Sequence, residues 1–215
     1  GIGRQKLTAR EVTTVGTRWV VASSPVALSL AAVAWTGSRF VAVGEGGTVL
    51  TSPDGLAWTP QVSGTTAALG GVVWSGTQLV AVGSGGTILT SPDAVGWTPR
   101  SPVTTYPLSG VAWNGALFVA VGGTVGPTSS GGTSITSTDG VTWSAPQGSF
   151  SDRIAVTASS TSWVTVGARL TRNIQTGATT RRGSIETSLD ASAWTSRTSG
   201  TESYLFAVVG AEYVL

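Results

Sequence analysis

The sequence predicts an all-β protein built from a repeated unit, and three observations support this prediction. First, two closely similar segments begin at Leu30 and Leu69, LAAVAWTGSRFVAVGEGGTVLTSPDGLAWTP and LGGVVWSGTQLVAVGSGGTILTSPDAVGWTP. Second, Trp35, Trp74 and Trp113 follow one another at intervals of 39 residues. Third, each unit contains four short stretches rich in Val, Thr and Gly, which favour strands and tight turns. A period of about 40 residues with four strands is typical of a β-propeller blade.

Each repeat predicts four strands in the same order. The first, of the LAAVAW type, ends shortly before a turn glycine, and the second reads FVAVG or a close variant. The third reads GTVLTS, GTILTS, GTSITS or GSIETS, and the short fourth strand carries a second tryptophan. Alternation along each strand would place one set of side chains between neighbouring blades. The predicted blades span residues 30–64, 69–103, 108–147 and 153–198 of a single propeller domain covering residues 1–215.

The two ends of the chain predict one further, composite blade. Trp19 precedes Trp35 by 16 residues, as equivalent tryptophans do between successive full repeats, so residues 8–25 align with third and fourth strands. Residues 204–215 align with first and second strands. Pairing of the two ends would close a ring of about five four-stranded blades and remove its open sheet edges.

An alternative alignment of the ends leaves the ring open. It matches Val12–Ala22 with Val33–Val43 and makes the terminal segments leftover pieces of a larger array. This alternative predicts a truncated fragment, or an assembly in which one chain completes the next. Closure within the chain is preferred because it leaves no unpaired half-blade.

Composition excludes several kinds of chemistry. The chain has no cysteine and no histidine, which removes disulfides, thiolate ligands, the usual general base and the commonest metal ligand. The formal net charge is +2 and only 10% of residues are charged, which does not favour a nucleic-acid partner. We therefore expect no cofactor, with calcium on carboxylate oxygens as the one metal considered.

The sequence gives no sign of a membrane-inserted segment. Its unbroken apolar stretches are far shorter than the roughly 20 residues that a membrane helix needs, and the apolar region of a secretory signal is missing. The chain begins at Gly1 and contains no methionine, so we expect a processed product or an excised domain. It is expected to be a monomer or part of a larger assembly.

A second motif, Thr-Ser-x-Asp-x-x-x-Trp, occurs once in each full repeat. An Asp on a tight turn accepts hydrogen bonds from nearby backbone N–H groups, Ser bonds across the turn, and Trp packs as an apolar wedge. We therefore expect these residues to build the fold. They are Ser52, Asp54 and Trp58; Ser91, Asp93 and Trp97; Ser137, Asp139 and Trp143; and Ser188, Asp190 and Trp194.

This motif resembles the Asp-box, or bacterial neuraminidase repeat, whose pattern is Ser-x-Asp-x-Gly-x-Thr-Trp. The resemblance implies a propeller similar to sialidases, photosystem II assembly factors and bacterial surface propellers. It also implies that the Asp turns join third and fourth strands, on the face opposite the usual binding site. Sialidases further use three arginines and a Tyr nucleophile, and no arginine triad occupies matching positions here, so no catalytic residue is carried over.

Departures from the repeat indicate where a binding site lies. The connection between second and third strands is short in the first two repeats, but lengthens to residues 123–131 in the third and 168–182 in the fourth. The fourth connection contains four arginines, a set suited to a carboxylate, a sulfate or an acidic protein surface. These predicted binding residues are Arg169, Arg172, Arg181 and Arg182.

A pair of acids also departs from the repeat. Asp152 and Glu202 occupy one repeat position, just before first strands, where the other repeats carry no acid. They are weak catalytic candidates for glycoside cleavage, or ligands for a hard cation. Solvent-exposed turn residues are the simpler interpretation. Arg153, Tyr106 and Tyr204 lie on related connections and could orient a sugar.

Function is predicted more weakly than fold. A non-enzymatic binding or scaffold propeller, exported or displayed on a bacterial cell surface and mediating protein interaction, fits the composition best. A carbohydrate-binding lectin, with sugars stacked on tryptophan between blades, is the alternative. A glycoside hydrolase is the third hypothesis. The expected ligand is therefore a protein or a glycan, and the protein is expected to be extracellular or on the cell surface.

Overall fold

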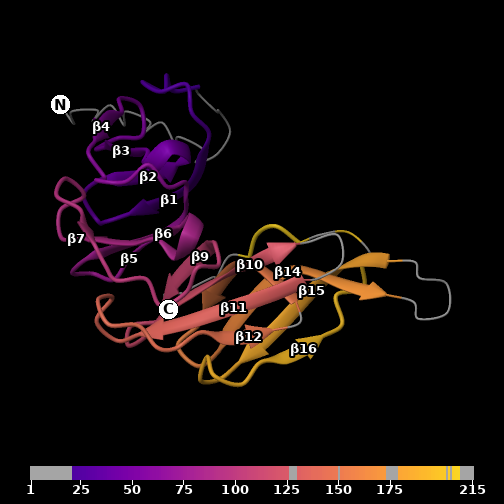
Figure 1. Ribbon diagram of the computed structural model, residues 1–215. Helices are drawn as coiled ribbons and strands as arrows, with labels where there is room; N and C mark the ends of the chain where they lie inside the picture. The colour runs from indigo at the N-terminus through magenta and orange to yellow at the C-terminus, as the bar shows by residue number, and fades with distance from the viewer. Residues whose placement is uncertain are drawn as a thin grey trace, which may run out of the picture.

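Four antiparallel sheets of four strands each make up the part of the chain that the computed structural model describes, residues 21–125, 130–149, 151–172, 179–201, 203 and 205–208 (Figure 1). Each sheet is one repeat, with its strands adjacent in chain order. The prediction of an all-β propeller fold is therefore confirmed. Most of the composite blade, residues 8–25 with 204–215, lies outside the described residues, and a fifth blade stays a prediction.

In the first two sheets, the strands fall at nearly the same positions of the repeat. The first contains β1 (Leu30–Trp35), β2 (Phe40–Gly44), β3 (Val49–Ser52) and β4 (Thr59–Gln61). The second contains β5 (Leu69–Trp74), β6 (Leu79–Gly83), β7 (Ile88–Ser91) and β8 (Thr98–Pro99). A single 3-10 turn joins the second and third strands in each: η1 (Glu45–Gly47) and η2 (Ser84–Gly86).

The third and fourth sheets have longer central strands. The third contains β9 (Leu108–Trp113), β10 (Phe118–Val125), β11 (Ser130–Ser137) and β12 (Gln147–Ser149). The fourth contains β13 (Ser151–Ala158), β14 (Trp163–Arg172), β15 (Thr179–Ser188) and β16 (Thr195–Arg197). The lengthened connections predicted as loops are thus largely strand, because the ladders continue past the point where the first two sheets turn.

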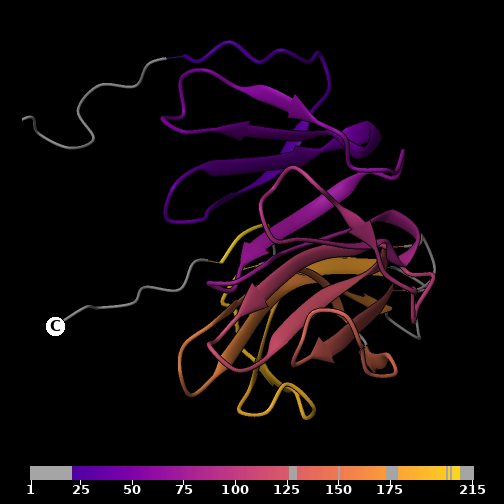
Figure 2. The ribbon, with the colours of Figure 1, turned by 90° about the vertical axis from the view of Figure 1, so that its left-hand side faces the viewer.

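The sheets follow one another face to face, and Figure 2 shows the first sheet at the top of this succession. The innermost strands pack in the order β1, β5, β9, β13. They approach closely: a Cβ added at Gly71 would lie 3.1 Å from the Cα of Gly110. Small residues on these strands therefore allow the sheets to converge.

Apolar side chains fill the spaces between successive sheets. Val41 and Val43 of the first sheet share one buried cluster with Leu69 and Val72 of the second. A second cluster joins the second and third sheets, and a third cluster joins the third and fourth. Trp97, Trp143 and Trp194 belong to these three clusters in turn. Each such tryptophan therefore packs between its own sheet and the preceding one.

The turns between third and fourth strands use one hydrogen-bond pattern. Ser52 Oγ donates to Asp54 Oδ1 at 3.1 Å, and this oxygen accepts two following backbone N–H groups at 2.8 and 3.2 Å. The Trp58 indole N–H donates to the Gly55 carbonyl at 3.0 Å. The Ser-to-Asp, Asp-to-backbone and Trp-to-backbone bonds recur at Ser91, Asp93 and Trp97, at Ser137, Asp139 and Trp143, and at Ser188, Asp190 and Trp194.

No helix among the described residues is long and apolar enough to cross a membrane.

Candidate functional site

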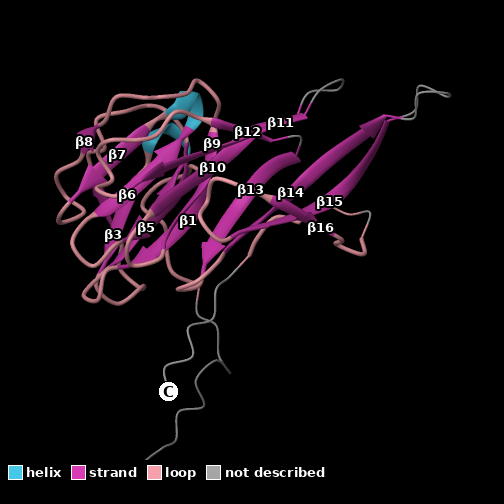
Figure 3. Ribbon diagram, turned by 90° about the horizontal axis from the view of Figure 1, so that it is seen from below, coloured by secondary structure: helices cyan, strands magenta, loops and turns pink. Residues whose placement is uncertain are grey.

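Two arginines face each other on the long hairpin of the fourth sheet. Arg169 on β14 and Arg182 on β15 are direct partners in the strand ladder, and both are exposed. The hairpin runs out beyond the rest of the molecule in Figure 3. Like charges placed directly opposite each other on a sheet repel.

A cavity of about 460 Å³ adjoins this pair. Arg169, Arg182 and Arg197 line it from three different strands, together with hydroxyl-bearing side chains that include Ser184 and Ser199. No acidic residue is among the described residues that line the cavity. Three arginines and several hydroxyl-bearing residues therefore border one concave surface, which we call the basic cleft.

The third arginine of the basic cleft is held by a hydrogen bond that recurs in the repeat. Arg197 Nε donates to Thr187 Oγ1 at 2.9 Å. Arg100 makes the same bond to Thr90 in the second sheet, and in the first sheet a glutamine, Gln61, does so to Thr51 at 3.0 Å. The same hydrogen bond thus holds the side chain at this position in three sheets, whether the residue is a neutral glutamine or a charged arginine.

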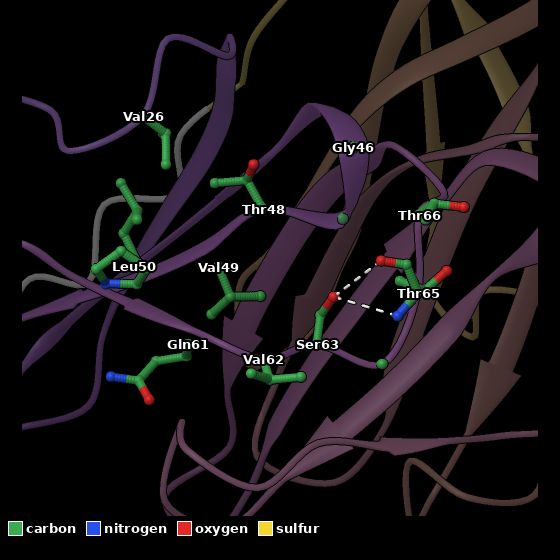
Figure 4. A pocket seen from close by; sticks show the side chains of 13 residues that line it. Val26, Gly46, Thr48, Val49, Leu50, Gln61, Val62, Ser63, Thr65 and Thr66 are labelled. Carbon is green, nitrogen blue, oxygen red and sulfur yellow. Dashed lines mark hydrogen bonds between the residues drawn. The ribbon is translucent and has the colours of Figure 1, made fainter.

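The first sheet carries a cavity of about 690 Å³ at the equivalent place (Figure 4). Its lining includes Thr48, Gln61 and Val62, where the basic cleft has Ser184, Arg197 and Thr198. The described residues that line this first cavity include no charged side chain. One position in the fold therefore supports a neutral cavity in the first sheet and a cationic cavity in the fourth.

Both cavities are bordered by the turn that leads out of the sheet. Ser63 Oγ donates to the Thr65 carbonyl and accepts the Thr65 N–H, as the dashed lines in Figure 4 show. Ser199 makes the same two bonds with Thr201, and also donates to the Gly183 carbonyl at 2.8 Å. The walls of the basic cleft are therefore hydrogen-bonded scaffold and not free loop.

Arg153 is buried and does not lie at the surface, where a residue that orients a ligand would be expected. Its guanidinium is 2% exposed, with Nε 2.8 Å from Glu186 Oε2 and Cζ 4.6 Å from the centroid of the Trp194 ring. Burial lowers the pKa of Arg153, and the Glu186 carboxylate opposes this by favouring the charged form. The prediction of a sugar-binding role for Arg153 therefore gives way to a buried ion pair within the fourth sheet.

Asp152 is also buried, with 3% exposure, and not a residue of an exposed turn. It stands on β13 next to Arg153, in the interface between the third and fourth sheets, where its side chain lies close to Gly123. Glu202, its predicted catalytic partner, lies outside the described residues, so their pairing stays a prediction.

Sequence reasoning missed Glu186, although a signal was present. In the strand ladders, Arg153 occupies the position of Leu69 and Leu108: Arg153 pairs with Gly167, Leu69 with Gly83 and Leu108 with Gly122. Glu186 occupies the position of Leu50, Leu89 and Ile135. An apolar pair of the repeat has thus become an ion pair. Comparing repeats position by position along the third strand would have found it.

Four other predicted residues do not line the basic cleft within the described part of the structure. Tyr106 is 48% exposed and lies on the connection between β8 and β9. Arg172 and Arg181 lie on β14 and β15, but their side chains are outside the described part of the structure. Tyr204 is likewise outside it.

The Asp turns are strongly anionic sites of the scaffold. Backbone N–H groups of Thr142 and then Val141 lower the pKa of Asp139 to about 2. The corresponding N–H groups also lower the pKa of Asp54 and of Asp93. At Asp190 the Ser192 hydroxyl is the largest cause of a lowered pKa. Within the described ranges, these and the other acids form no cluster of three or more metal-ligating side chains.

The sequence comparisons find no match, and two solved structures that resemble this one share little sequence with it. No family model matches the sequence, and no curated protein does. The structure is similar to a mutant of the Bombyx mori GH32 β-fructofuranosidase in complex with sucrose, at 11% identity and a TM-score of 0.47. That match covers 79% of this chain and 49% of the other, so the chain spans about half of that enzyme.

A second solved structure, YCF48 bound to a D1 peptide, is similar at 13% identity and a TM-score of 0.36. This match covers 80% of this chain and 82% of the other. The class of this protein, a β-propeller of four-stranded sheets, therefore rests on its own strand topology.

Proposed function

We propose that this propeller is a non-enzymatic binding protein whose basic cleft holds an acidic, extended segment of a partner protein. The observation that carries the proposal is the direct cross-strand pairing of Arg169 and Arg182 above a cavity that Arg197 also lines. Guanidinium groups match the geometry of carboxylates and bind them through paired hydrogen bonds. Aspartate and glutamate side chains are therefore the groups that this surface recognises.

The edge of the fourth sheet favours an extended ligand. β16 is the outer strand and pairs with β15 only along Ile185–Thr187, so Thr179–Ser184 extends past the end of β16. The Gly183 carbonyl already accepts a hydrogen bond from Ser199, so a peptide laid along Thr179–Arg182 could continue the sheet by backbone pairing while its alternate side chains reach the arginines.

The alternative of sugar stacking on the motif tryptophans has less support. Trp58, Trp97, Trp143 and Trp194 each use the indole N–H on a carbonyl of their own turn, and the last three pack between sheets. Their rings are already in contact with protein. We likewise propose that the protein acts outside the cell.

Fluorescence anisotropy with labelled hexaglutamate, and with hexaglutamine as the neutral control, tests the proposal. Hexaglutamate is expected to bind, and Arg169→Ala with Arg182→Ala should weaken binding at least about tenfold. Arg100→Ala is the matched control, because that arginine sits at the equivalent of Arg197 in the second sheet and should leave affinity unchanged.

Two outcomes would overturn the proposal. Binding of hexaglutamate that ignores Arg169→Ala and Arg182→Ala would place the acidic ligand elsewhere. Binding of a sulfated oligosaccharide that depends on these arginines, with no binding of hexaglutamate, would make the ligand an anionic glycan.

A further inference from the structure

One apolar face of the first sheet is buried at Ala42 and Leu50 but exposed along β1. Leu30 and Val33 on β1 are 44% and 60% exposed, and Trp35 is 47% exposed. The equivalent Leu69 and Val72 on β5 are 1% and 8% exposed. We call the surface made by Leu30, Val33 and Trp35 the open face.

The open face is exposed because of its place in the succession. Leu69 and Val72 share their cluster with the first sheet, and Leu108 and Val111 share theirs with the second. This face of a sheet is thus buried by the sheet that precedes it, and no described sheet precedes the first. A contiguous exposed apolar surface of this kind marks a place where something else packs.

The chain enters the first sheet as if it came from a preceding sheet. Ser24 Oγ donates to the Val26 carbonyl and accepts the Val26 N–H. These are the two bonds that Ser63 makes with Thr65 on the way from the first sheet to the second. Residue 21 therefore stands where the outer strand of a preceding sheet would end.

The chain leaves the fourth sheet as if it entered a following one. Ser199 and Thr201 repeat the same turn, and six residues after Ser199 the Leu205 N–H reaches the Gly167 carbonyl at 3.4 Å. Leu69 likewise comes six residues after Ser63 and begins β5. Leu205 is therefore in the place where the inner strand of a further sheet begins.

We propose that the open face is covered by a fifth sheet assembled from residues 8–20 and 205–215 of the same chain. The first segment leads into residue 21 with the sequence pattern of third and fourth strands, and the second leads on from Leu205 with that of first and second strands. Each segment supplies the half that the other lacks. One sheet placed there both follows the fourth sheet and precedes the first, so it buries the open face.

Chemical crosslinking in the full chain tests this proposal, since the sequence contains no cysteine. Val33→Cys and Val214→Cys would place thiols on the open face and on the proposed second strand. Val72→Cys and Val41→Cys form the matched control pair: Val72 is the equivalent of Val33, Val41 is the equivalent of Val214, and both belong to one buried cluster. A short bismaleimide should link each pair within one chain in similar yield, as read by intact mass and peptide mapping.

Other crosslinking results would overturn the proposal. Covalent dimers from the Val33→Cys and Val214→Cys chain would show that a second copy covers the open face. Absence of any link, with the control pair linked, would show that this terminal segment does not reach it.

A second measurement does not depend on cysteines. Val33→Asp is expected to lower Tm by about 10 °C, as Val72→Asp should, because each would bury a carboxylate between sheets. Val62→Asp is the control, since Val62 is 84% exposed and should tolerate the charge. If Val33→Asp behaves like Val62→Asp, the open face is bare and the proposal fails.

Discussion

The first and fourth sheets share the same strand order and turn hydrogen bonds, but differ in the side chains that fill their interior and line their cavities. Both keep the Ser-x-Asp turn, the hydrogen bond from a long side chain to a third-strand threonine, and the serine turn at the exit. Between these fixed points, Leu30 and Leu50 of the first sheet are replaced in the interior of the fourth by Arg153 and Glu186. In the cavity, Gln61 is replaced by Arg197. Local hydrogen bonds thus preserve the sheet while its packing positions diverge.

The comparison separates two groups of residues: those that form hydrogen bonds within one sheet, and those that contact a neighbouring sheet or the solvent. The turn residues satisfy backbone groups within their own repeat, so their role does not depend on neighbours. The replaced residues contact the preceding sheet or the solvent, so each is suited to one place in the succession. Four predictions test this separation.

The largest effect is expected from Glu186→Leu, which restores the repeat residue but leaves Arg153 buried without its carboxylate. Breaking a buried ion pair from one side costs about 3–5 kcal/mol of unfolding free energy. Changing Arg153→Leu as well should recover most of the loss, because replacing both partners by apolar residues is often neutral or stabilising. Denaturant unfolding of both variants checks this. A double variant as unstable as the single one would contradict the repeat equivalence.

Gly47→Ala and Gly183→Ala should come next. A Cβ at Gly47 would collide with the Thr65 carbonyl oxygen, and one at Gly183 with the Ser203 carbonyl oxygen. Overpacking of this kind costs about 1–3 kcal/mol. Thermal unfolding measures the loss in each sheet. Gly148→Ala is the control, because nothing lies within 4 Å of its added Cβ, and equal effects at all three sites would refute the argument.

Asp139→Asn should change the response to acid. The native pKa of about 2 lies below the ordinary 3.8, so this carboxylate adds stability above pH 3.8. That stability is lost as the pH falls from 3.8 through 2. Asn cannot titrate, so the variant should lose less Tm than the native chain between pH 5 and pH 2 (an order-of-magnitude window for carboxylates). An unchanged acid slope would show that the other Asp turns dominate.

The smallest effect on stability is expected from Arg197→Gln, which gives the basic cleft the residue that the first cavity has. Glutamine can keep the bond to Thr187, as Gln61 does to Thr51. The unfolding free energy should therefore change by less than about 0.5 kcal/mol. Hexaglutamate affinity should still fall about threefold or more through lost charge. Arg100→Gln should change neither quantity, and a loss of affinity there would argue against a localised site.

The candidate site was only partly accessible from sequence. The concentration of arginines in the fourth repeat was visible, but the segment was read as a loop, because composition does not show that a ladder continues to Arg172 and from Thr179. Arg197 lies on β16, outside the lengthened connection, and only the folded sheet brings it to the same cavity as Arg169 and Arg182. Arg153 is expected from the sequence to orient a sugar, because its partner Glu186 lies 33 residues away along the chain.

The amino-acid sequence by itself settled the repeat, the four strands of each unit and the Ser-x-Asp turns, because periodicity and turn chemistry act over a few residues. It could not say which faces are buried, since burial depends on which sheet stands next to which. Val33 and Val72 occupy the same place in their repeats, yet one is 60% and the other 8% exposed. Their difference arises only when the sheets are assembled in space, as do the ion pair of Arg153 with Glu186 and the meeting of three arginines at one cavity.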